Sequence, residues 1–100
     1  MEKLVDLFRI EQEIEKAKHA NNLNHALKLY NQVILIKQQI SNKLGLAKTY
    51  AEMAFLLEQK GSYQEAYYLL SKAANISENS PNRQFNSIIS SRIHSLSHHL

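Results

Sequence analysis

The chain of 100 residues contains no cysteine. Disulfide bonds, thiolate catalysis and zinc sites built on cysteine are therefore excluded. The sequence also has no apolar run that approaches the length of a bilayer, so no membrane-spanning helix is expected. The N-terminal stretch MEKLVDLFRIEQEIEK mixes acids and bases and lacks the apolar core of a signal peptide. These absences favour a cytoplasmic protein.

Glycine and proline are scarce, with two and one in the whole chain. Both residue types interrupt regular structure, and few runs of β-branched residues stand between them. The sequence therefore predicts an all-α fold. A chain of this length is enough for one domain of ordinary small size.

Charge of one sign is not concentrated in the chain. Twelve basic and nine acidic residues are interspersed and leave a net charge of +3. Residues 79–100 contain Arg83 and Arg92 and no acid. A nucleic-acid interface needs more lysines and arginines on one face, with aromatic residues interleaved, and two arginines are too few, so nucleic-acid binding is not expected.

The most informative stretch runs from Gly61 to Ile76 and reads GSYQEAYYLLSKAANI. Gly61 suits the left-handed conformation that ends a helix. Ser62 followed by Glu65 predicts a capping box that opens the next helix. One apolar stripe then follows at helical spacing, and it consists of Ala66, Leu70 and Ala73. This pattern predicts the turn and second helix of a helical hairpin.

An earlier copy of this stretch begins at Asn21. Asn21 and Asn22 align with Gly61 and Ser62, and asparagine suits both a left-handed C-cap and an N-cap. The helix positions that align at the same offset are Leu23 with Tyr63, Ala26 with Ala66, Leu29 with Leu69, Tyr30 with Leu70, Val33 with Ala73 and Ile36 with Ile76. A fixed offset with matching chemistry indicates a repeat architecture.

These residues resemble a tetratricopeptide repeat. The resemblance covers residues 47–80 well and residues 7–46 more weakly, and it rests on Tyr50, Met53, Ala54, Leu57, Gly61, Tyr63, Ala66, Leu70 and Ala73. The period here is longer than the usual one of the family, about 40 rather than about 34 residues, and is similar to the longer-helix variety. A second departure is the late proline, Pro81. The resemblance implies a right-handed superhelical stack of antiparallel hairpins.

Five helices are expected, at about 2–20, 23–40, 44–60, 62–77 and 81–100, with Ser80 as the N-cap of the last and Pro81 at its first position. The predicted organisation is one domain, with a degenerate first repeat at 1–42, a second repeat at 43–79 and a capping helix at 80–100. A hairpin cannot bury its apolar faces alone, so stacking has to supply the core.

Chemical sites have weak support. His94 and His98 are one helical turn apart, a spacing that can bind a metal, but no acid in the last helix completes such a site. Glu11 and Glu15 also lie one helical turn apart, without a nucleophile or a phosphate-binding loop nearby. Surface charge, partly balanced by lysines, explains them better. We therefore expect no enzyme activity, no metal and no cofactor.

Apolar residues outside the inward stripes are more informative. Phe55 points about 160° away from the stripe centred near Leu57, at about 100° per residue. In tetratricopeptide folds the first helix of each repeat lines a concave groove, and the resemblance places Phe8, Glu11, Glu15, Lys48, Ala51, Glu52 and Phe55 at groove positions. Alternatively, the fifth helix or long neighbouring side chains cover the two phenylalanines. The family's clamp for a terminal carboxylate is not supported, because Ala51 and Phe55 occupy positions that require polar groups.

The resemblance thus implies a protein–protein interaction module, an adaptor that holds a peptide or helix of a partner protein in its groove. Two other functions remain open. The first is a structural module that forms a homodimer. The second is a three-helix domain of the microtubule-interacting-and-trafficking type, which residues 22–30 (NLNHALKLY) also suit, although the internal repeat argues against it.

Overall fold

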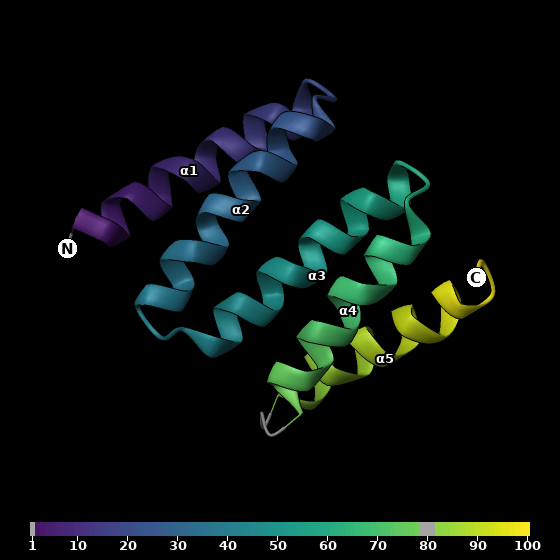
Figure 1. Cartoon of the computed structure of the whole chain (residues 1–100). Helices are drawn as coiled ribbons and strands as arrows, with labels where there is room; N and C mark the ends of the chain where they lie inside the picture. Colours follow the sequence, from purple (N-terminus) through teal and green to yellow (C-terminus); the bar gives the residue numbers. More distant parts are fainter. Residues whose placement is uncertain (1, 79–81) are drawn as a thin grey trace. The chain divides into compact units, whose positions relative to one another are not determined.

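The computed structural model describes residues 2–78 and 82–100, which contain five α-helices and no β-strand. The helices are α1 (Glu2–His19), α2 (Leu23–Gln39), α3 (Lys43–Gln59), α4 (Tyr63–Ser77) and α5 (Arg83–Ser97), as drawn in Figure 1. The predicted all-α fold is confirmed. The right-handed superhelical arrangement of the hairpins stays a prediction.

The first compact unit, Met1–Asn42, is a helical hairpin in which α1 packs against α2. Its buried apolar residues are Ile14, Ala17, Ala26, Leu29, Tyr30, Val33 and Ile34. These residues recur at intervals of three and four along their helices, so each helix buries one stripe. Figure 1 shows α1 and α2 lying side by side and joined by a short turn.

The second compact unit, Lys43–Leu100, contains three helices. Helix α4 packs against α3 and also against α5 (Figure 1). The predicted stripe of Ala66, Leu70 and Ala73 is completely buried. Helix α5 contributes Ile89 and Leu96 to the core, whereas Ile88 and Leu100 are about half exposed.

Three turns of the same geometry connect the first four helices. At each, a residue with positive φ follows the helix: Asn21 (58°), Ser41 (57°) and Gly61 (83°). The backbone N–H of the residue that follows donates a hydrogen bond of 2.8–3.0 Å to the carbonyl oxygen five residues earlier. The three bonds run from Asn22 to Ala17, from Asn42 to Lys37 and from Ser62 to Leu57. The hydrogen-bond pattern is the Schellman motif. Because the three turns are evenly spaced along the chain, the repeating element is one helix plus one turn, half of the predicted repeat.

The helix N-termini differ from the prediction at two places. Ser62 is the N-cap of α4, but its side chain makes no capping hydrogen bond, so the predicted capping box with Glu65 is wrong. Helix α5 begins at Arg83 and its N-cap is Asn82, whose Oδ1 accepts from the Phe85 N–H at 3.0 Å. The predicted N-cap Ser80 and first residue Pro81 lie outside the described residues.

The two asparagine caps provide a direct comparison with Ser62. Asn22 accepts from the His25 N–H at 3.3 Å, in the same manner as Asn82. Replacement of Asn82 by alanine should lower the free energy of unfolding by about 1 kcal/mol, the usual loss for a capping side chain. Ser62→Ala should cost less than about 0.5 kcal/mol, because no capping bond is lost. Urea denaturation followed by circular dichroism measures both, and an equal cost for the two variants would contradict the assignment of the caps.

Candidate functional site

The predicted groove positions fall into two sets. Phe8, Glu11 and Glu15 lie on α1 in the first unit, and Lys48, Ala51, Glu52 and Phe55 lie on α3 in the second. Ala51 is 3% exposed and belongs to the core, so it is not open to a partner. Each set is described within its own unit.

On α1 the phenylalanine is open to solvent and the two acids have basic neighbours. Phe8 is 66% exposed. Glu11 lies 3.8 Å from the Lys37 ammonium group of α2, and Glu15 lies 3.4 Å from Lys18 one turn along its own helix. The carboxylates of this stripe are therefore partly neutralised within the unit. The large exposed apolar residues at this end of α1 are Leu4, Val5 and Phe8.

On α3 the ring of Phe55 is half-buried, and the guanidinium group of Arg92 lies over it. Lys48 and Glu52 are exposed. The guanidinium carbon of Arg92, from α5, lies 4.7 Å from the centre of the Phe55 ring. The same guanidinium lies 3.4 Å from a carboxylate oxygen of Glu58. Coverage by α5, one of the two interpretations of the sequence, therefore holds for Phe55.

An open hollow lies beside this cluster, between α3 and α5. It has a volume of about 290 Å³, and its lining consists of Glu58, Gln59, Tyr63, Arg92, Ser95, Leu96 and His99. Leu96 is buried and belongs to the core, whereas His99 and Ser95 are exposed. The hollow thus combines a buried apolar side chain with several polar groups at its rim, as small binding sites commonly do.

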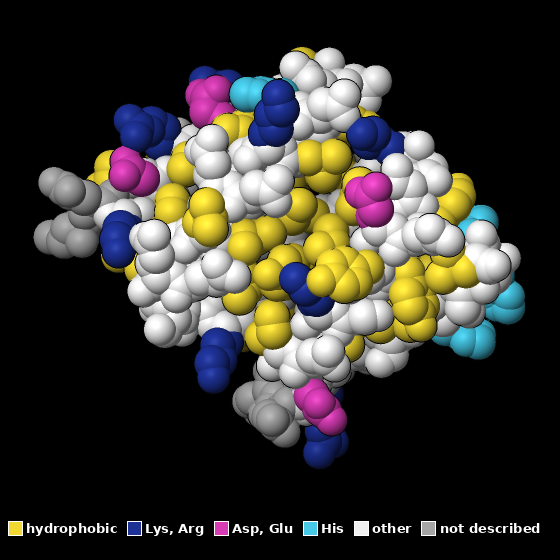
Figure 2. All heavy atoms as spheres, in the orientation of Figure 1, with side chains coloured by type: hydrophobic (Ala, Val, Ile, Leu, Met, Phe, Trp, Pro, Cys, Tyr) yellow, Lys and Arg dark blue, Asp and Glu magenta, His cyan; other side chains and the backbone are white. Residues whose placement is uncertain are grey.

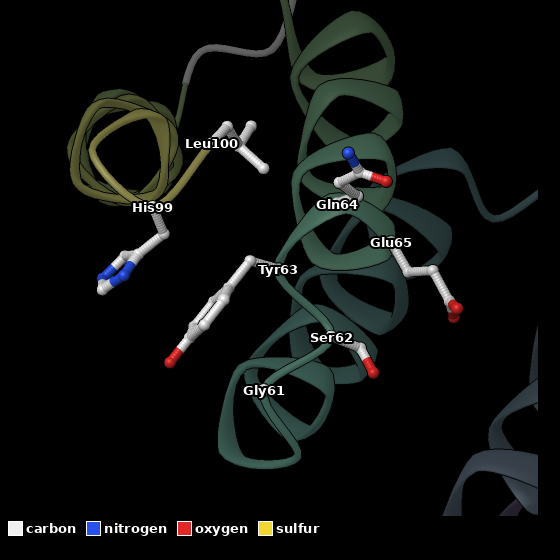
Figure 3. A pocket seen from close by; sticks show the side chains of 7 residues that line it. All are labelled: Gly61, Ser62, Tyr63, Gln64, Glu65, His99 and Leu100. Atoms are coloured by element: carbon white, nitrogen blue, oxygen red, sulfur yellow. The ribbon is translucent and has the colours of Figure 1, made fainter.

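One wall of the hollow is a pair of stacked rings. The rings of Tyr63, at the start of α4, and His99, just after α5, are 4.3 Å apart between centroids and 11° from parallel. Figure 3 shows the two rings facing each other, Tyr63 at the start of α4 and His99 in the residues that follow α5. A second hollow of about 430 Å³ lies on this side, lined by Gly61, Ser62, Tyr63, Gln64, Glu65, His99 and Leu100. Tyr63 and His99 line both hollows, so the stack stands between them.

Sequence reasoning missed Arg92, Glu58, Tyr63 and His99 as site residues. The sequence indicates Arg92 only as one of two arginines in a segment without acids. Its position over Phe55 depends on how α5 packs near α3, which no spacing along the chain reveals. The contact between Tyr63 and His99 likewise depends on helix packing, in this case of α5 against α4.

His94 and His98, whose spacing can bind a metal, lie next to each other at the C-terminal end of α5. The rings of His94 and His98 lie edge to face, 5.2 Å apart between centroids. In the part of the chain that the structure describes, no group of three or more His, Asp or Glu side chains could hold a metal ion. Figure 2 shows histidines gathered near the end of α5, while basic and acidic side chains are interspersed over the face drawn.

The chain matches no protein-family model, no curated protein and no solved structure. Among residues 2–78 and 82–100, no helix combines the length and apolar character that crossing a membrane requires.

Proposed function

We propose that this chain is a protein–protein interaction module that binds a peptide or helix of a partner protein. The observation that carries the proposal is the hollow between α3 and α5 with its rim of Arg92, Tyr63 and His99. Arginine and tyrosine are enriched among the residues that contribute most to protein interfaces. Arg92 is held by Phe55 and Glu58 of α3, and Tyr63 by the ring of His99, so less conformational entropy is lost when a partner binds.

The resemblance to tetratricopeptide repeats supports the same function. In that family the first helix of each repeat presents the binding surface, and the resemblance assigns groove positions to α1 and α3. The proposed site keeps Lys48, Glu52 and Phe55 of the predicted groove and adds α5, which the sequence predicts as a capping helix, because Arg92 of α5 lies over Phe55. Phe8, Glu11 and Glu15 form a second proposed contact surface on α1. The proposed activity is binding rather than catalysis, and the proposed location is cytoplasmic.

Self-association is the second candidate, and the exposed end of α1 favours it. Leu4, Val5 and Phe8 are large apolar residues, each more than half exposed. Apolar side chains gathered on a surface usually mark an interaction site. The three-helix alternative has less support, because the described residues form five helices.

Sedimentation together with peptide selection distinguishes the two candidates. For an adaptor, the protein alone should sediment as a monomer and should enrich peptides from a random decapeptide library displayed on phage. Phe55→Ala should weaken binding of an enriched peptide about fivefold or more, because it removes the aromatic ring over which the Arg92 guanidinium lies. The matched control is Leu35→Ala, which removes an exposed apolar side chain of the other unit that belongs to neither proposed contact surface.

A self-associating module would give a different result. The wild type would then sediment as a dimer, Phe8→Asp would dissociate it, and no peptide would be enriched. Circular dichroism of each variant shows that the helices are intact at the temperature of the binding measurement.

A further inference from the structure

We propose that the hollow between α3 and α5 receives an acidic side chain, so that the partner's peptide carries an internal aspartate or glutamate. This inference rests on the proposed function and specifies the chemistry of the partner. It differs from the terminal-carboxylate clamp of the family that the sequence resembles, because Ala51 and Phe55 occupy the clamp's polar positions here.

The geometry of Arg92 is the first reason. Its guanidinium lies over the Phe55 ring and beside Glu58, two contacts that restrain its position. The side chain is nevertheless 45% exposed. A guanidinium carries five N–H donors in a planar fork, and the single contact with Glu58 at 3.4 Å uses only part of them. The arginine is therefore placed to donate to a second carboxylate from solvent.

The charges around the hollow are the second reason. Glu58 is the one acid among its lining residues, its side chain is only 18% exposed, and it already contacts Arg92. Residues 79–100 contain no acid. The other polar lining groups, from Gln59, Tyr63, Ser95 and His99, can all donate hydrogen bonds. Arg92 is 45% exposed, so the more accessible charge of the Glu58–Arg92 pair is positive. An incoming carboxylate therefore meets an exposed cation and several donors, whereas the acid that an ammonium group would need is largely buried.

The stacked wall is the third reason, because it gives the rest of the peptide an apolar surface. The rings of Tyr63 and His99 stand beside the hollow, and the buried Leu96 is part of its lining. Aromatic faces bury substantial area at little cost in conformational entropy. A short acidic peptide could thus place its carboxylate at Arg92 and its aliphatic carbons against this wall.

A nucleic acid also presents anions, but the hollow does not suit one. Phosphate-backbone binding needs a row of basic residues with interleaved aromatic side chains. Arg92 is the one arginine or lysine among the lining residues of the hollow. The carboxylate of a protein is therefore the anion that this site favours.

Selection from the phage-displayed decapeptide library tests the inference. The wild type should enrich peptides that contain Asp or Glu, and changing that acid to its amide in a synthetic, C-terminally amidated copy should weaken binding about tenfold. Arg92→Gln should weaken binding of the acidic peptide by a similar factor. Arg92→Lys should weaken binding by less, because lysine keeps the positive charge but lacks the planar set of N–H donors of a guanidinium. Arg83→Gln is the matched control: it removes the same charge from the same helix outside the hollow, and it should leave the affinity nearly unchanged.

The possible outcomes separate this inference from the function it rests on. If no peptide is enriched, the proposed function fails as well. If peptides are enriched without a preference for acids, or if Arg92→Gln and Arg83→Gln weaken binding equally, the acidic site is wrong while the binding function stands. Displacement of the acidic peptide by a single-stranded oligonucleotide at equal concentration would point to nucleic acid and would also overturn the inference.

Discussion

Replacement of Leu96 by alanine is expected to lower the free energy of unfolding of the second unit by about 2–5 kcal/mol, the range for a buried leucine whose loss leaves a cavity. Leu96 is 2% exposed and lies on α5, which packs against α4. The size of the effect depends on α5 being part of the core of this unit. Urea denaturation followed by circular dichroism measures the loss.

Ile88→Ala is the matched control for Leu96→Ala. It removes an aliphatic side chain of similar size from the same helix at a position that is about half exposed, so its cost should be less than about 1 kcal/mol. If both variants unfold at the wild-type urea concentration, α5 is an appended segment rather than part of the core. The hollow between α3 and α5 would then lack a fixed wall, and the proposed acidic site would lose its basis.

The positions of the helices were largely predictable because each follows from local rules. Each helix shows an inward stripe at intervals of three and four, and the left-handed conformation at Gly61 was expected from its lack of a side chain. The turn at Ser41 was not recognised as equivalent. Serine seldom adopts a positive φ, so the residue type gave no signal. The spacing along the chain did give a signal, because position 41 lies midway between Asn21 and Gly61, which the sequence predicts as turn residues.

The candidate site was only partly predictable. For both Phe8 and Phe55 the sequence left two interpretations open, because an outward direction does not tell whether another helix covers the residue. The ring of Phe8 is 66% exposed, whereas Phe55 is half-buried. Arg92 covers it from α5. Such a contact joins residues far apart in the chain and depends on helix packing, which sequence periodicity does not specify.

Ala66→Leu should also strongly destabilise the protein, by about 1–3 kcal/mol, because a well-packed interior resists added volume. Ala66 is completely buried in the first turns of α4, where α4 packs against α3. A leucine there needs space that neighbouring side chains now fill. Asn75→Leu, at an exposed position of the same helix, is the control and should change the free energy of unfolding by less than about 0.5 kcal/mol.

The equivalent change in the first unit extends this test to the repeat. Ala26 aligns with Ala66 and is also completely buried, and the N–H of each donates to the N-cap carbonyl of its helix at 3.1 Å. If the two positions have the same role, Ala26→Leu and Ala66→Leu should destabilise their units by similar amounts. A large cost at Ala66 with none at Ala26 would show that only the second hairpin relies on this close contact. Wild-type stability in both variants would contradict the alignment of the two hairpins, since both alanines would then tolerate a side chain that a tight helix contact excludes.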